Sequence, residues 1–233
     1  MEFVPEYAPL VILGFLLTGL VLGALAASVL VAWAARQHNV AGWLLASLVL
    51  VGGTYASLLL GFSLLSCEKT LAPGEWKYFC EVDCHLAYAV ADVSTVKTLG
   101  PAARPTTAQG TFYVVTLKTW FDERTISPRR PRDLPLTPDP REVAVIDEQG
   151  RVFPVPEDGQ RTLGEIKAAG TPLTQPLRPG ESYTTTLVFD LPADVRQPRL
   201  LLTTVGSPTY FLIGHENSFF HRKVYFRLDT SKP

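Results

Sequence analysis

The chain has 233 residues and a formal net charge of −1, from 21 lysines and arginines against 22 aspartates and glutamates. This balance excludes a basic surface built for nucleic acid, so no nucleic-acid partner is expected. The charges are unevenly distributed, because residues 1–67 hold only three of them and residues 68–233 hold 20 basic and 20 acidic ones. The division predicts a membrane segment followed by a water-soluble domain.

Two long apolar runs, residues 7–35 and 37–67, carry no formal charge. Each is longer than the roughly 20 residues that a helix needs to cross a hydrocarbon layer about 30 Å thick. The runs predict a transmembrane helical hairpin, with helices at about 8–35 and 40–66 and the lipid bilayer as a partner. The alternative, a cleaved signal peptide, is disfavoured by the acidic start of the chain and by the length of the first run.

Arg36 is the one formal charge in the short connection between the runs. Positive residues mark cytoplasmic loops, so the connection is expected in the cytoplasm. We therefore predict a two-pass protein of the cell membrane whose C-terminal domain lies outside the cytoplasm, in the periplasm or its equivalent. Small residues also recur at spacing four, at Gly19 and Gly23 and again at Gly53, Ser57 and Gly61. They indicate either packing of the two helices on each other or docking to a larger membrane complex.

The domain formed by residues 68–233 has the composition of an all-β protein. It holds 17 of the 19 prolines, which favour short strands and turns over long helices. Strands are predicted at 110–120, 143–146, 152–155, 182–191, 199–205, 210–213 and 223–228, with one short helical turn near 163–169. Strands of this length and spacing predict an antiparallel β-sandwich.

Between Phe121 and Arg141 this pattern is interrupted by five prolines and four arginines, Arg124, Arg129, Arg130 and Arg132. Such a composition predicts an extended, polyproline-like loop. The loop is either a long connection of the sandwich or a basic, stiff segment that binds a partner or anionic lipid head groups through its arginines.

The stretches Leu-Arg-Pro-Gly-Glu-Ser at 177–182 and Leu-Val-Phe-Asp-Leu-Pro at 187–192 carry a resemblance to a known group. They resemble bacterial immunoglobulin-like domains of unknown function, which commonly hang from lipoproteins or membrane helices. The resemblance covers about residues 76–228 and implies an immunoglobulin-like sandwich outside the cytoplasm. It implies no particular activity, and the chain departs from the lipoprotein form because it has no lipobox.

The stretch 76–93 alternates with period two and predicts one continuous strand. Cys80 and Cys84 then lie on the core face, whereas Glu81, Asp83 and His85 face solvent. The simplest interpretation is structural, with two small buried side chains and a solvated edge.

A disulfide is a second interpretation of the cysteines, because the space outside the cytoplasm is oxidising. Cys80 and Cys84 in an unbroken strand are about 13 Å apart, which is too far for a bond. A disulfide between Cys67 and either Cys80 or Cys84 remains an open alternative. It would leave one of the three cysteines without a disulfide partner.

A copper site is the third interpretation. The pattern Cys80-x-x-x-Cys84-His85 partly resembles the binuclear-copper loop of cytochrome c oxidase subunit II, a protein that also has two membrane helices before an outside β-domain. Thiolate and imidazole are suitable copper ligands, and His215 or His221 are candidates to complete the set. The chain departs from that family in three respects. The loop lies far from the C-terminus, its histidine follows the second cysteine directly, and no methionine follows it.

Motifs for hydrolytic or transfer chemistry are missing from the sequence: it has no G-x-S-x-G, no phosphate-binding loop and no H-E-x-x-H. The leading hypothesis is therefore a non-enzymatic, membrane-anchored accessory or binding subunit of an envelope or membrane complex, with no cofactor. The alternative is a copper-binding or redox protein that uses Cys80, Cys84 and His85.

Overall fold

The computed structural model of the chain describes residues 8–81, 84–101, 103 and 105–228. By its internal contacts the chain divides into two units. We call them the helical unit, residues 1–67 together with 206–222, and the β unit, residues 68–205 together with 223–233. By this division the β unit begins at Glu68. The inclusion of residues 206–222 with the helices was not predicted.

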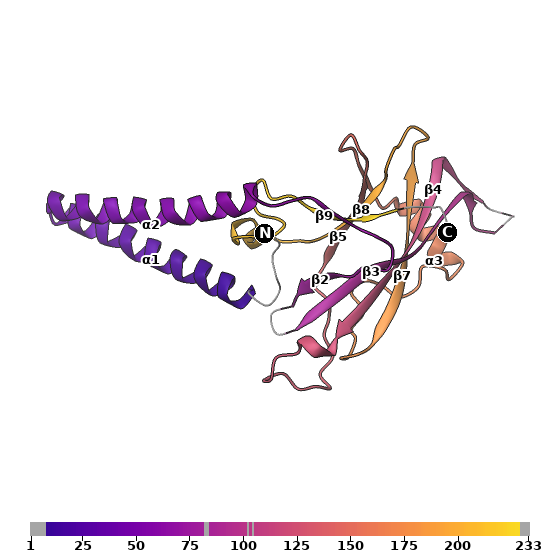
Figure 1. Ribbon diagram of the computed structural model, residues 1–233, viewed down its shortest axis with the longest axis horizontal. Helices are drawn as coiled ribbons and strands as arrows, with labels where there is room; N and C mark the ends of the chain where they lie inside the picture. Colours follow the sequence, from indigo (N-terminus) through magenta and orange to yellow (C-terminus); the bar gives the residue numbers. More distant parts are fainter. Residues whose placement is uncertain (1–7, 82–83, 102, 104, 229–233) are drawn as a thin grey trace. The chain divides into compact units, whose positions relative to one another are not determined.

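The apolar runs form two helices of 27 residues each, α1 (Ala8–Ala34) and α2 (His38–Leu64), which run side by side (Figure 1). Each helix is about 40 Å long at 1.5 Å per residue, so both are long and apolar enough to cross a membrane. Most of their side chains are exposed, including Trp33 at 68% and Trp43 at 78%. Arg36 lies in the connection with a left-handed backbone, at φ 57°.

The contact between the two helices does not use the small residues that the sequence singled out. Among the described residues, a Cβ added at Gly19, Gly23, Gly53 or Gly61 would meet no atom within 4 Å. At Gly52 it would lie 3.7 Å from Cδ2 of Leu22 on the other helix. The four glycines of the predicted stripes therefore make no close contact with the other helix.

Two β-sheets make up the β unit (Figure 1). The five-stranded sheet has the order β1 (Lys69–Leu71), β9 (Val224–Arg227), β8 (Arg199–Thr204), β5 (Arg141–Ile146) and β6 (Val152–Pro154). The four-stranded sheet has the order β2 (Lys77–Cys80), β3 (His85–Leu99), β4 (Thr106–Asp122) and β7 (Ser182–Leu191). The pairs are antiparallel, as predicted, except that β1 runs parallel to β9.

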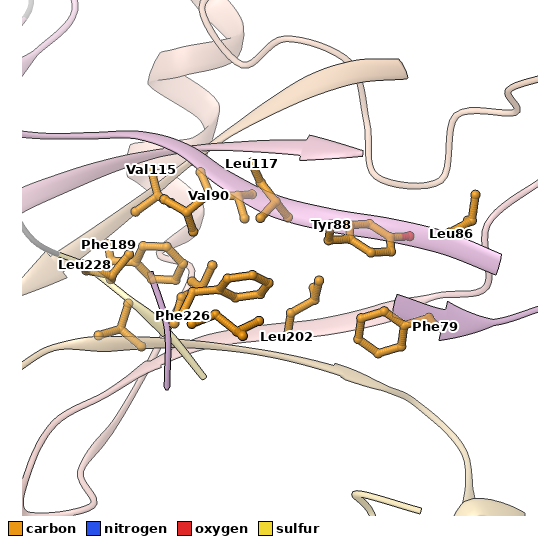
Figure 2. Packing of buried hydrophobic residues seen from close by; sticks show 14 of the residues in the cluster. Phe79, Leu86, Tyr88, Val90, Val115, Leu117, Phe189, Leu202, Phe226 and Leu228 are labelled. Atoms are coloured by element: carbon orange, nitrogen blue, oxygen red, sulfur yellow. The ribbon is translucent and has the colours of Figure 1, made fainter. Parts of the chain in front are cut away.

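Alternating apolar side chains from both sheets fill the space between them, so the β unit is a sandwich. Figure 2 shows this core, in which Val90, Val115 and Leu117 of the four-stranded sheet face Leu202 and Phe226 of the five-stranded sheet. All five side chains are fully buried. The core lies where the period-two pattern of β4, β7 and β8 places it.

Two predicted elements differ from the structure. The helical turn expected near 163–169 is the helix α3 (Glu157–Glu165), which begins after Pro156 with two acidic residues in its first turn. Acidic side chains favour a helix N-terminus, which explains the earlier start. The strand expected at 210–213 is wrong, because Ser207–Phe211 forms a 3-10 helix, η3, with Pro208 in its first turn.

Candidate functional site

The segment around the cysteines turns instead of continuing as one strand. β2 ends at Cys80, β3 begins at His85, and the backbone N–H of Glu81 donates to the carbonyl of Cys84 at 2.9 Å. Residues 82–83, which include Asp83, lie outside the described part of the chain. The prediction of an unbroken strand over 76–93 is therefore wrong, and the separation of about 13 Å inferred from it for Cys80 and Cys84 no longer applies.

The turn reverses which side chains of the first strand face the core. Phe79 pairs with Leu86 on the buried face, whereas Cys80 pairs with His85 on the opposite face. Cys84 is 1% exposed and packs in the core cluster with the apolar side chains. The expectation that Cys80 and Cys84 share the core face is wrong, since only Cys84 lies there.

Cys80, His85 and Asp122 form one row across three strands. Cys80 is paired in register with His85, and His85 is paired with Asp122 of β4. Directly opposite residues have Cβ atoms about 4.5–5.5 Å apart and share a face of the sheet. The row brings a thiol next to an imidazole, and the imidazole next to a carboxylate.

The carboxylate of Asp122 already has strong partners. It accepts from Nε and Nη2 of Arg124, both at 2.9 Å, and from the hydroxyl of Tyr78 at 3.2 Å. These hydrogen bonds to Arg124 lower the pKa of the Asp122 carboxyl. Arg124 also lies 5.4 Å from the ring centroid of Trp120, which contacts Trp76 at 5.5 Å. The outer face of the hairpin is thus a half-buried aromatic and polar surface.

The predicted copper ligands are divided between the two units. Cys80, Cys84 and His85 belong to the β unit, and His215 and His221 belong to the helical unit. Within the described residues, no group of three or more His, Cys, Asp or Glu side chains is arranged to hold a metal ion. Nδ1 of His215 accepts from the backbone N–H of Asn217 at 3.0 Å. Cys80 and His85 are the two candidates that the structure brings together.

The cysteines are present as thiols. Cys67 is exposed and belongs to the helical unit, Cys80 is half-buried and Cys84 is buried. A bond between Cys67 and either of the others stays a prediction.

Glu81 was expected to face solvent, and that expectation is wrong. Its side chain is 3% exposed and forms an ion pair with Arg141, which is 1% exposed and begins β5 in the opposite sheet. The guanidinium of Arg141 lies 4.4 Å from the ring centroid of Phe79 and 5.7 Å from that of Tyr88. Burial raises the pKa of Glu81 to about 7, although the charge of Arg141 acts in the opposite direction.

Lys77 makes a second buried polar link between the sheets. Its ammonium donates to the carbonyls of Leu202 at 2.6 Å and Val224 at 3.2 Å, on β8 and β9. Sequence reasoning missed both Lys77 and Arg141, because their partners lie far away in the sequence. The available signal was Lys77, a charged residue that alternates with Phe79 and Glu81 on one face of the stretch.

The arginines of the 121–141 loop have different environments. Arg124 is paired with Asp122, and Arg130 is half-buried with Nη2 donating to the carbonyls of Leu134 at 3.3 Å and Pro135 at 3.1 Å. Arg129 and Arg132 are exposed. The loop is attached to the sandwich by mutual backbone hydrogen bonds between Leu136 and Leu177. Arg124, at 72%, is exposed as well but is paired with Asp122, so Arg129 and Arg132 are the exposed arginines for which no ion pair is described in this loop.

A shallow depression of about 650 Å³ lies beside the start of β7. Its titratable groups are Glu181 and Tyr183. Glu181 accepts from the backbone N–H of Arg178 at 2.7 Å, and the hydroxyl of Tyr183 donates to the carbonyl of Leu173 at 2.7 Å. Both groups stabilise the surrounding loop.

No protein-family model matches the chain. No curated protein matches it significantly. Among solved structures, the β-rich part is similar to a secreted protein of Mycobacterium tuberculosis, MPT63, at 12% identity and a TM-score of 0.42, covering 71% of this chain and 99% of that one. The yjhA protein of Bacillus subtilis is similar at 13% identity and a TM-score of 0.40, covering 69% and 100%. A conserved hypothetical protein of Bacillus anthracis is similar at 14% identity and a TM-score of 0.39, covering 55% and 85%.

Proposed function

We propose that the chain is a two-pass membrane protein whose β-sandwich serves outside the cytoplasm as a non-enzymatic binding or accessory subunit of a membrane or envelope complex. The observation that carries the membrane assignment is the exposed apolar surface of α1 and α2. In the apolar window of each helix, 0% and 6% of the residues are buried. A core helix of a water-soluble protein would bury these side chains, whereas lipid solvates them.

The orientation rests on the connection between the helices. Arg36 lies there and is exposed, and Trp33 and Trp43 flank it. Tryptophan is enriched at membrane boundaries, and arginine at the cytoplasmic one. The tryptophans support a position of the connection at a membrane boundary, and Arg36 supports the cytoplasmic boundary, with the β unit on the other side.

The binding role is supported by how the β unit uses its polar side chains. Asp122 with Arg124, Asp147 with Arg151, and Glu81 with Arg141 form ion pairs that stabilise strands and turns. These pairs leave the exposed Arg129 and Arg132 of the 121–141 loop as a basic surface for a partner. The immunoglobulin-like character is supported by two sheets packed face to face.

The test of the anchor is extraction of membranes from expressing cells with alkaline carbonate, with the intact mass of the protein measured afterwards. The full-length chain is expected in the membrane pellet. Recovery of a shortened chain in the supernatant would contradict the anchor.

The test of the binding role is native mass spectrometry of the chain released in a mild detergent. A stoichiometric membrane or envelope protein is expected beside it, and the double variant Arg129→Ala/Arg132→Ala is expected to reduce its amount. The matched control is Arg161→Ala/Arg196→Ala, which removes two exposed arginines outside the loop. Equal loss in both double variants, or a chain without a partner, would contradict the role.

A second candidate is a copper-binding or redox function, favoured by the cross-strand pair of Cys80 and His85. Elemental analysis and electron-spin spectra after copper loading test it. Stoichiometric copper that is lost in Cys80→Ser and His85→Ala, but retained in Cys67→Ser, is expected if the candidate is correct. No bound copper in the unchanged protein would exclude it.

A further inference from the structure

Residues 206–222, which we call the aromatic segment, return to the helices from the far end of the sequence. The segment belongs to the same unit as α1 and α2. Two hydrogen bonds attach it to α2 and to the residues after it. The hydroxyl of Tyr55 donates to the carbonyl of Phe211 at 2.7 Å, and the backbone N–H of Arg222 donates to Oγ of Ser66 at 2.8 Å.

These two hydrogen bonds place the aromatic segment along the last turns of α2. Tyr55 precedes the end of the helix at Leu64 by nine residues, or about 14 Å at 1.5 Å per residue. Arg222 lies at the level of Ser66, just beyond that end. Phe211 lies within one side-chain length of Tyr55, because the Tyr55 hydroxyl is bonded to its carbonyl. The segment therefore descends beside the helix instead of leaving it.

The depth of the aromatic segment in a bilayer can be inferred from Trp43, which lies near the start of α2. Tyr55 follows Trp43 by 12 residues, or about 18 Å along the axis. With Trp43 at one boundary of a hydrocarbon layer about 30 Å thick, Tyr55 lies roughly 12 Å inside the opposite boundary. The Phe211 end of the aromatic segment is then at membrane depth.

The side chains that the aromatic segment exposes suit lipid. Tyr210, Phe211 and Phe219 are 45–47% exposed and Phe220 is 75% exposed. Tyr210 and Phe219 stack at 6.0 Å, and Phe211 contacts Phe219 edge-on at 5.7 Å. Between residues 206 and 221 the sequence has one formal charge, Glu216. The segment thus presents a rigid aromatic cluster to its surroundings.

Hydrogen bonds within the aromatic segment satisfy several of its backbone groups, which lowers the cost of bringing a non-helical chain to the membrane. Oγ1 of Thr209 donates to the carbonyl of Gly206 at 2.6 Å, and the hydroxyl of Ser218 donates to the carbonyl of Leu212. The N–H of His221 donates to the carbonyl of Ser218 at 3.0 Å. That last bond closes a turn in which Phe220 has a φ of 63°, a left-handed conformation that is costly for an aromatic residue. The strained turn holds the most exposed aromatic ring outward.

We infer that the aromatic segment is a membrane-inserted loop that docks the protein's C-terminal sequence into the bilayer beside α2, with lipid acyl chains and the head-group boundary as its partner. The inference rests on the proposed membrane anchor and adds a third contact with the bilayer. The Tyr55–Phe211 hydrogen bond holds the segment beside α2. Phenylalanine rings that enter lipid leave water, and this transfer favours insertion of the segment.

The experiment uses the full chain with Cys67→Ser, reconstituted in phosphatidylcholine vesicles and labelled with a polarity-sensitive fluorophore at one introduced cysteine. The test site is Phe220→Cys. Leu50→Cys, 70% exposed in the middle of α2, reports whether the helices cross the bilayer, and Gln149→Cys in the exposed β5–β6 turn is the aqueous control. Quenching is measured with aqueous iodide and with nitroxide-labelled lipids. The unmodified Cys67→Ser chain measures background labelling of Cys80 and Cys84.

A label at Phe220→Cys is expected to be quenched several-fold more by the nitroxide lipid than by iodide, as at Leu50→Cys and opposite to Gln149→Cys. Lipid quenching at Leu50→Cys combined with iodide quenching at Phe220→Cys would overturn the inference and leave the anchor intact. A Phe220→Cys label that neither quencher reaches would also overturn it, because protein would then cover the segment. Iodide quenching at Leu50→Cys would contradict the anchor itself.

Discussion

Glu81 and Arg141 form a buried ion pair that joins the two sheets of the sandwich, with side chains 3% and 1% exposed. Glu81 follows β2 in the four-stranded sheet, and Arg141 begins β5 in the five-stranded sheet. Breaking a buried pair leaves one charge uncompensated, whereas replacing both charges with apolar groups removes the need for compensation. The pair therefore fixes which ends of the two sheets meet.

Removing one member of this pair is expected to be costly. Arg141→Met should lower the free energy of unfolding by about 3–5 kcal/mol at pH 8. The double variant Glu81→Leu/Arg141→Met should recover most of that loss, because no charge is left buried. Urea unfolding of the full chain in mild detergent, followed by near-UV circular dichroism, measures both. Additive losses in the double variant would contradict the coupling.

The same glutamate predicts a dependence of stability on pH. The pKa of Glu81 is about 7 in the folded protein and 4.5 for the ordinary side chain, so the folded state holds the proton more tightly. Tighter proton binding by Glu81 stabilises the folded state fully below pH 4.5. This stabilisation is lost as pH rises through 7, and the free energy of unfolding falls by about 3 kcal/mol.

Glu81→Gln tests this dependence, because glutamine does not titrate. The difference in unfolding free energy between the unchanged protein and Glu81→Gln should change by about 3 kcal/mol between pH 4.5 and 8. The unchanged protein should be the one that loses stability as pH rises. Asp139 and Arg141 remain in both proteins, so their effects largely cancel. A difference that stays constant over the window would show that Glu81 is ionised throughout.

Arg130 is expected to hold the 121–141 loop in shape. Its guanidinium donates to the carbonyls of Leu134 and Pro135 and lies 5.8 Å from the ring centroid of Phe121. Arg130→Ala should therefore speed cleavage after Leu136 by chymotrypsin several-fold, since the loop opens more often. Arg129→Ala, at an exposed neighbour, is the control and should cleave at the original rate. Equal rates in all three proteins would refute this role.

Tyr55→Phe removes one hydroxyl, and with it the hydrogen bond to the carbonyl of Phe211. A neutral hydrogen bond contributes about 1 kcal/mol, so amide hydrogen exchange across the aromatic segment should accelerate about fivefold. Exchange within β3 and β4 should not change, because these strands belong to the β unit. Hydrogen-exchange mass spectrometry of the full chain measures both regions. Unchanged exchange in the segment would contradict its attachment through Tyr55.

The helices and most strands could be predicted because their signals are local. The charge-free runs give α1 and α2 to within about two residues at each end, and alternation with β-branched side chains gives β7 and β8. The small-residue stripes were visible too, but sequence cannot say which face of a helix meets its neighbour. The helices meet near Gly52 instead.

The candidate site could not be predicted, because its geometry depends on distant partners. Alternation continues through residues 81–84, and the turn there reverses the faces of β2 relative to β3. Alternation suggested that Glu81 faces water, but Arg141 on the opposite sheet pairs with it inside the sandwich. Lys77 donates to the carbonyl of Leu202, a partner 125 residues later in the sequence. Likewise, Tyr210–Ile213 has strand-forming side chains, yet Phe211 is bound by Tyr55, 156 residues earlier.

The central claim is a membrane hairpin with the β unit outside the cytoplasm, and labelling with a membrane-impermeant maleimide in intact cells tests it most directly. On the Cys67→Ser background, one cysteine is introduced at Gln37 in the helix connection or at Gln149 in the β5–β6 turn, and Arg36 is left in place. We predict that Gln149→Cys is labelled in intact cells, whereas Gln37→Cys is labelled only after permeabilisation. The reverse pattern, or labelling of neither site until the cells are permeabilised, would contradict the account.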